Sequence, residues 1–346
     1  MRGKQFLALL VVAALLPPAA ALAQADPAVA RAVESLHGWQ QADGGFTNGF
    51  AEGSNIGATA DAVLALVAAG MDPAEWTIGG HDPLEYLAAE TGNVSGPGEA
   101  AKVAMAVTAA GLDASAFGGS DLIAVIQGGF DPATGLFGGG PFDSALALIA
   151  LVAADDPAPE GAVDGLLATR LEDGSFSFTG DTTPGAGDSN TTALAIQALV
   201  AAGAGDQVGP SIEYLRAAQN DDGGWTYQKP SAFGEETDAN STALAIQALL
   251  AGGEDLAAWG DPVQSLLSLQ APSGAFLFNR SIGADNVLAT VQAIPALAGL
   301  SYADVAARGG QLAPARQAPQ TGVALAVLAI LAVVLAAGLV FARRRG

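Results

Sequence analysis

The sequence predicts an all-α fold, in which about six helix pairs form a closed double ring of inner and outer helices. Two near-identical segments, residues 188–203 and 238–253, show that the chain is built from repeats. Segments that are apolar on nearly all sides alternate with segments that are apolar on one face. Because a helix that is apolar all round has to be buried, the first kind forms an inner layer and the second an outer layer.

Six segments rich in Ala and Leu are predicted as the inner helices. Each opens near an Asp, Asn, Gly or Ser that can cap a helix, and most close on Gly. Gln197, Gln247 and Gln292 are predicted to share one register and to hydrogen-bond between neighbouring helices. The six segments are residues 55–70, 98–111, 142–155, 188–203, 238–253 and 285–299.

Six amphipathic segments are predicted as the outer helices. Their charged residues lie on one face, and their apolar residues recur at helical spacing. Several begin with Pro, which suits the first helical turn because an N–H group there has no partner within the helix. The six segments are residues 26–41, 82–92, 120–130, 160–171, 210–220 and 261–271.

A turn motif follows several outer segments. It consists of a leucine, a glutamine four residues later, a glycine four residues after that, and then an aromatic residue two positions on. In one copy Arg170 replaces the glutamine. Glycine permits the tight reversal between two helices. The residues of this structural repeat motif are Gln40, Gly44, Phe46, Gly174, Phe176, Gln219, Gly223, Trp225, Gln270, Gly274 and Phe276.

This turn motif resembles the QW repeat of squalene–hopene cyclases and of the related prenyltransferase-type α/α toroids, over residues 26–300. The resemblance implies an α/α toroid of about six helix pairs. It also implies that the motif glutamine caps the next helix by accepting from free N–H groups, and that the aromatic ring packs over it. Asp221 and Asp222 lie inside the motif, where other copies hold different residues. They are interpreted as turn residues, with a metal or catalytic pair as the alternative.

The segment "DANSTA", residues 238–243, resembles the Asp-x-Asp-Asp-Thr-Ala motif of the same cyclases. In that family the middle Asp protonates an alkene, and here Asn240 stands in its place. The segment "DSNTTA" repeats this departure with Asn190. An amide cannot supply the proton, so the resemblance implies that the cyclase acid motif is not retained. Asp188 and Asp238 are interpreted as helix N-caps.

Composition excludes several other chemistries. The chain has no Cys and two His residues, which excludes Cys-ligated zinc and thiol nucleophiles. Prenyltransferases and thioester proteins with this fold need such residues, so neither a metal nor another cofactor is expected. All 35 acidic residues lie within residues 24–305 beside six basic ones, a net charge of about −29. Such a surface repels nucleic acid, which is therefore not expected as a partner.

The lumen of the ring, at the N-terminal ends of the inner helices, is the expected ligand site. No residue is assigned a catalytic role. The expected function is a non-catalytic ligand-binding or interaction module, whose partner is a small hydrophobic or sugar ligand or a surface protein. The alternatives are a structural surface component, an enzyme of the terpenoid cyclase or prenyltransferase-like superfamily, and a carbohydrate-active enzyme that uses lumenal carboxylates. The candidate residues of the lumen and rim are Asp143, Asp188, Asn190, Trp225, Tyr227, Asp238, Asn240 and Asp285.

The two ends of the chain predict export and a membrane anchor. Residues 1–23 have the basic start, apolar stretch and small-residue site of a signal peptide. Residues 24–305 form the toroid and residues 306–322 a linker. Residues 323–341 are continuously apolar, and as a helix they span roughly 28 Å, about one bilayer core. The basic tail, residues 342–346, orients this transmembrane helix with the domain outside the cell.

The sequence "APQTG", residues 318–322, lies directly before the predicted transmembrane helix. It resembles a sortase sorting signal with Ala in place of the usual first Leu. We therefore expect an exported protein that is held in the cell membrane by one helix, with sortase-type cell-wall attachment after Thr321 as the alternative.

Overall fold

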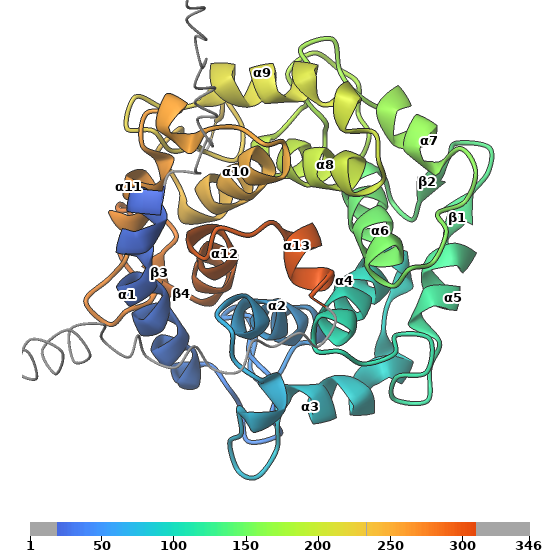
Figure 1. Cartoon of the computed structure of the whole chain (residues 1–346), viewed down its shortest axis with the longest axis vertical. Coiled ribbons are helices and arrows are strands. Elements are labelled where there is room, and N and C mark those ends of the chain that lie inside the picture. Colours follow the sequence, from blue (N-terminus) through green and yellow to red (C-terminus); the bar gives the residue numbers. More distant parts are fainter. Residues whose placement is uncertain (1–18, 233, 309–346) are drawn as a thin grey trace, which may run out of the picture. The chain divides into compact units, whose positions relative to one another are not determined.

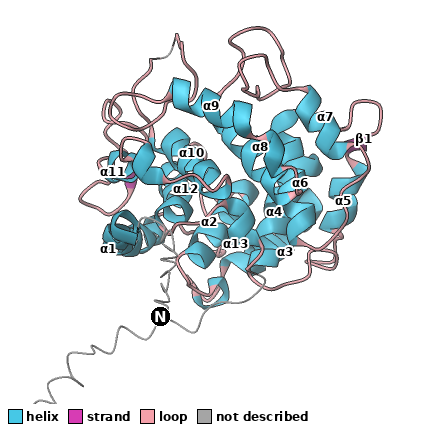
Figure 2. Cartoon of the chain, turned by 45° about the horizontal axis from the view of Figure 1, so that its top comes forward, coloured by secondary structure: helices cyan, strands magenta, loops and turns pink. Residues whose placement is uncertain are grey.

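The computed structural model describes residues 19–232 and 234–308 of the chain. Helices dominate these residues, as the sequence predicts, and the strands are short (Figure 2). None of the helices described is both long enough and apolar enough to cross a membrane. The predicted transmembrane helix, the APQTG sequence, the basic tail and the first 18 residues of the predicted signal peptide lie outside the described residues.

The inner layer consists of six helices that pack against one another in a closed cyclic order (Figure 1). They are α2 (Ile56–Ala68), α4 (Gly96–Ala109), α6 (Pro141–Ala153), α8 (Ser189–Ala201), α10 (Ala239–Ala251) and α12 (Val287–Leu297). Each contacts the next along the chain, and α12 contacts α2. Nearly every side chain of these helices is buried, because they face neighbours on all sides.

Six further helices, of which all but α1 are shorter than the inner ones, form an outer layer (Figure 1). They bury one face against the inner layer and expose the other, as their amphipathic sequences predict. These helices are α1 (Ala19–Ser35), α3 (Pro83–Glu90), α5 (Leu122–Gly128), α7 (Ala162–Ala168), α9 (Gly209–Ala218) and α11 (Pro262–Leu267). Five 3₁₀ turns complete the connections described, at Leu36–Gly38, Pro73–Glu75, Thr91–Asn93, Gly205–Gln207 and Leu256–Ala258.

One further helix, α13 (Tyr302–Ala306), was not predicted as an element of its own. It lies inside the ring and contacts α2, α4, α6 and α8 (Figure 1). Ser301 and Asp304 form a capping box at its start, and Tyr302 and Val305 are buried. Five residues are too few to show a helical period, so hydrophobic patterning cannot reveal such a helix.

The motif glutamines connect distant parts of the outer layer. The Gln219 side-chain amide donates to the Gly223 carbonyl at 2.8 Å and to the Trp259 carbonyl at 2.7 Å. Gln40 makes the same pair of bonds to Gly44 and Trp76, and Gln270 to Gly274 and Ala28. The expectation that these glutamines accept from helix N–H groups is wrong, because the side-chain amide donates to carbonyl oxygens instead. The bond to Ala28 joins the first outer helix to the last.

The motif glycines have left-handed backbones and lie against the backbone of the neighbouring outer segment. Gly223 has φ +86°, and a Cβ placed there would come within 2.3 Å of the Gly260 carbonyl oxygen. Gly44, Gly174 and Gly274 have equivalent conformations and equally close backbone neighbours. Only glycine fits such a position. Asp222 accepts from the Gly224 N–H group and from the Thr237 hydroxyl, so its interpretation as a turn residue is confirmed.

A buried aromatic residue joins each turn to an inner helix. Its backbone N–H group donates to a hydroxyl in the first turns of that helix, a bond that the sequence did not suggest. The pairs are Phe46–Thr59, Phe137–Ser144, Phe176–Thr192, Trp225–Thr242 and Phe276–Thr290, at 2.8–3.0 Å. Two of these aromatic residues, Phe137 and Phe276, belong to short antiparallel strand pairs. These are β1 (Phe130–Asp131) with β2 (Leu136–Phe137), and β3 (Phe276–Leu277) with β4 (Asp285–Asn286).

Candidate functional site

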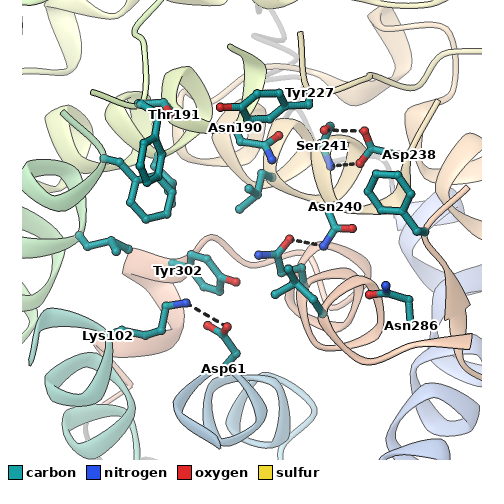
Figure 3. Close-up of a pocket in the computed structure, with 18 of the residues that line it drawn as sticks. Asp61, Lys102, Asn190, Thr191, Tyr227, Asp238, Asn240, Ser241, Asn286 and Tyr302 are labelled. Atoms are coloured by element: carbon teal, nitrogen blue, oxygen red, sulfur yellow. Dashed lines mark hydrogen bonds and ion pairs between the residues drawn. The ribbon is translucent and has the colours of Figure 1, made fainter. Parts of the chain in front are cut away.

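The inner helices surround a cavity of about 420 Å³ (Figure 3). Its volume falls in the range of ligand sites, roughly 300–1,000 Å³. Most of its wall is apolar, since four leucines and six aromatic residues contribute to it. The aromatic residues are Phe50, Phe142, Phe178, Tyr227, Phe278 and Tyr302.

All six inner helices contribute one residue to the same level of the cavity. Each of these residues lies six or seven positions after the N-cap of its helix, so the cyclic packing brings them into one ring. Three of the six are polar and three are leucines. In the order of the chain they are Asp61, Lys102, Leu146, Leu194, Leu244 and Gln292.

Asp61 and Lys102 form an ion pair inside this ring (Figure 3). Lys102 Nζ lies 3.0 Å from Asp61 Oδ2, and the side chain of Asp61 is 4% exposed. Burial raises the pKa of Asp61, and the neighbouring Lys102 charge partly opposes this effect. A second cavity of about 260 Å³ shares both residues with the first. The pair therefore faces both parts of the lumen.

Hydrogen bonds extend the polar side of the ring. The Asn240 side-chain amide donates to Gln292 Oε1 at 2.9 Å, across α10 and α12. The side chain of Gln292 in turn bonds to the hydroxyl of Tyr302, on α13. Burial and the charge of Asp61 raise the pKa of Tyr302 well above its usual value, so this hydroxyl keeps its proton. The lumen thus contains one polar belt, which consists of Asn240, Gln292, Tyr302, Asp61 and Lys102.

Two buried aspartates lie at the N-terminal ends of α8 and α10. Asp238, which lines the cavity, is 2% exposed, and burial raises its pKa to about 6. Its two oxygens accept from the backbone N–H and the hydroxyl of Ser241, at 2.7 and 2.8 Å. Asp188 is bound in the same way by Thr191, and burial also raises its pKa to about 6. Both are N-caps, as predicted.

Tyr227 connects the two aspartates. Its side chain hydrogen-bonds to Asp188, and its backbone bonds to the carboxyl group of Asp238. Burial and the Asp188 charge raise the pKa of this tyrosine to about 12. Phe50, Phe178 and Tyr227 contribute to the cavity wall and are exposed to solvent, Phe50 most of all. The ring centroids of Phe142 and Phe178 lie 4.9 Å apart.

The structure brings together most of the candidate residues predicted from the sequence. Asn190, Tyr227, Asp238 and Asn240 line the cavity, and Asp188 contacts it through Tyr227. Three others do not line it. Asp143 accepts from the Gly139 N–H group, and Asp285 is exposed in β4. Trp225 is fully buried in the core rather than at the rim, and its buried indole N–H donates to the Leu215 carbonyl at 2.7 Å.

Lys102, Gln292 and Tyr302 were not predicted as lumen residues. For Lys102 a signal was present, since this charged residue interrupts a helix that is otherwise apolar. Gln292 was placed at the wrong register: it lies six residues after its cap, whereas Gln197 and Gln247 lie nine after theirs. Gln197 instead accepts from the Tyr302 N–H group and so supports α13.

Comparison with known proteins finds the fold among solved structures. The type II terpene cyclase MstE from Scytonema, without ligand, has a TM-score of 0.60 at 16% identity, covering 80% of this chain and 98% of that chain. A variant of it in complex with geranylgeranyl dihydroxybenzoate has a TM-score of 0.59 at 14% identity, covering 82% and 99%. Haptocorrin in complex with Cbi has a TM-score of 0.54 at 14% identity, covering 81% and 68%. No protein-family model and no curated protein matches the sequence.

The described part of the chain therefore has a terpene cyclase-like helical fold. These neighbours correct the expectation of a non-catalytic module, because they include a cyclase in complexes with its substrate and its product. That expectation followed from Asn240, which occupies the place of the family's acid, and from the interpretation of Asp238 as a helix cap alone. Asp238 caps its helix and also lines the cavity, as does the buried carboxyl group of Asp61.

Proposed function

We propose that the chain is an α/α toroid enzyme, with QW-type repeats, that rearranges an apolar isoprenoid-type chain by acid catalysis in its central cavity. One observation carries this proposal: buried carboxyl groups with raised pKa values line a cavity whose wall surface is mostly aromatic and aliphatic. Sugars need polar groups along most of a binding site. The lining therefore supports an isoprenoid substrate over a carbohydrate.

Asp238 is the proposed proton donor. It lines the cavity, and with a pKa of about 6 roughly a tenth of its carboxyl groups keep their proton at about pH 7. The N–H and hydroxyl groups of Ser241 hold the carboxyl group in one orientation. Asn240 is occupied by its bond to Gln292 and has no acidic proton to give.

In the proposed reaction, the π electrons of a substrate double bond take the proton of Asp238, which becomes a carboxylate. The positive charge that forms on carbon is attacked by a second double bond, which closes a ring. Loss of a proton from a neighbouring carbon to a base then restores a double bond, so that the product is an isomer of the substrate. The faces of Phe142, Phe178 and Phe278 stabilise the positive charge by cation–π attraction.

The test is a reaction in D₂O. We expect the purified full-length chain to convert farnesol, geranylgeraniol or squalene to an isomeric product that carries solvent deuterium, detected by gas chromatography with mass spectrometry. Asp238→Asn keeps the N-cap but removes the acid, and should lower the rate at least about 100-fold.

Asp121→Asn is the matched control. Asp121 is an exposed N-cap of the outer helix α5, where its side chain accepts from the Ala124 N–H group, and the same substitution there should leave the rate unchanged. Equal rates in both variants, or a product without deuterium, would contradict the proposal.

We also propose that the protein is exported and held in the membrane by a helix at residues 323–341, with processing after Thr321 as the alternative. The sequence supports these proposals. Protease accessibility of the domain on intact cells of the host tests them. Digestion only after lysis would contradict display outside the cell.

A further inference from the structure

The lumen is divided into a polar and an apolar side at one level. Asp61, Lys102 and Gln292 form one half of the ring of six lumen residues, and Leu146, Leu194 and Leu244 form the other half. A substrate without any polar group would leave the polar half facing hydrocarbon. Desolvating that half without new hydrogen bonds is unfavourable.

The charges of the cavity disfavour an anionic head group. Among the residues that line the described cavity, Lys102 is the one cation, and Asp61 lies 3.0 Å from it. A diphosphate would have to displace Asp61 and then face that carboxylate as well as Asp238. The chain as a whole carries a net charge of −22, which repels polyanions further.

An uncharged hydroxyl group fits the same place. It can donate to a carboxylate oxygen and accept from an ammonium group at once, so Asp61 and Lys102 could both bind it without separating. Tyr302 and Gln292 supply further donors and acceptors beside the pair. Asn190 Oδ1 is a buried acceptor in the cavity wall that lacks a hydrogen-bond partner in the structure.

From this division we infer that the substrate is an amphiphile with an uncharged polar head group, such as a polyprenyl alcohol, and that the Asp61–Lys102 pair binds this head. The inference rests on the proposed function for the identity of the tail. Asp238 lies six residues before Leu244, the member of the ring of six lumen residues on α10, which is about 9 Å along the helix axis. Head binding at the pair therefore places carbon atoms of the tail, rather than the head, beside Asp238.

Isothermal titration calorimetry with the full-length Asp238→Asn variant, which cannot turn the ligand over, tests the inference. The probes are geranylgeraniol, geranylgeranyl diphosphate and a hydrocarbon of the same length. We expect the alcohol to bind at least about tenfold more tightly than either of the others, since one charge-assisted hydrogen bond is worth about that factor. Tighter binding of the diphosphate, or equal binding of alcohol and hydrocarbon, would overturn the inference.

Three substitutions in the same background locate the effect. Lys102→Met should remove the preference for the alcohol over the hydrocarbon, whereas Lys229→Met, on an exposed loop, should not. Asp61→Asn frees Lys102 from its partner and should raise affinity for the diphosphate about tenfold. Identical preferences in the Lys102 and Lys229 variants would contradict a head site at this pair. These readouts measure binding of the probe rather than formation of a product, so failure of the proposed reaction is distinguishable from failure of this binding site.

Discussion

The carboxyl group of Asp238 caps a helix and also faces the cavity. As a cap it accepts from the Ser241 N–H group, which favours its charged form, whereas burial favours its neutral form. Burial has the larger effect, so the pKa rises to about 6. A capping aspartate can therefore keep a proton that it can donate, although the cyclase-type acid position holds an amide.

The rate should depend on pH through this carboxyl group. A proton donor is active while it is protonated, so the rate should be constant below about pH 6 and fall about tenfold per pH unit above it. Measuring the initial rate of product formation between pH 4.5 and about 8.5 checks this prediction. A rate that rises through this range would contradict the assignment of Asp238 as the acid.

Stability should depend on pH in the same window. Between about pH 4 and 6 the folded protein holds a proton on Asp238 that the unfolded chain has released, so the free energy of unfolding falls as the pH rises. The effect is on the order of 2–3 kcal/mol. Asp238→Asn should lose this part of the pH dependence, whereas Asp121→Asn should keep it. Denaturant unfolding of the three proteins at pH 4 and about 7 provides the measurement.

At the scale of elements, the turn glycines fix how closely successive outer segments approach. Gly223→Ala combines a left-handed backbone with a clash against the Gly260 carbonyl oxygen, and should destabilise the protein by about 2–4 kcal/mol. Gly253→Ala has a similar φ, +74°, but no atom near its new Cβ, and should cost only about 1 kcal/mol. Equal losses in urea unfolding would show that the close contact is unimportant.

The hydroxyl group that accepts a hydrogen bond from each turn should also contribute to the stability of the fold. Thr242→Val leaves the buried Trp225 N–H group without its acceptor and should cost about 1–3 kcal/mol. Thr108→Val is the matched control, because the Thr108 hydroxyl is buried and has no hydrogen-bond partner in the structure. Its loss should be neutral or stabilising in thermal unfolding. A larger loss of stability in Thr108→Val than in Thr242→Val would contradict a structural role for the Trp225–Thr242 bond.

For the molecule as a whole, net charge opposes compactness. The chain has 35 acidic and 13 basic residues, and few of the carboxylates described are paired with a cation. Salt shortens the range of their repulsion, so raising NaCl from about 0.02 to 0.2 M should raise the melting temperature by a few degrees. Differential scanning calorimetry measures this shift. An unchanged or lower melting temperature would show that the acidic surface does not strain the fold.

Patterns within single segments predicted much of the fold. The repeats at residues 188–203 and 238–253, their capping aspartates and the burial of the inner helices follow from composition and period, which depend on neighbouring residues alone. The hydrogen bond from Gln270 to Ala28 and the hydrogen bond from Tyr302 of α13 to Gln197 could not be predicted in this way. They connect residues far apart in the chain, and α13 is too short to show a period.

The sequence by itself determined the helices, their two kinds and the turns between them, because caps, glycines and hydrophobic period act over a few residues. Only the tertiary structure decided which side chains share the lumen. Asp61 and Lys102 lie 41 residues apart, and each looks like a single charge on an apolar helix until the packing of α2 against α4 brings them to 3.0 Å. The pKa of Asp238 also depends on burial by other segments, which local sequence does not reveal.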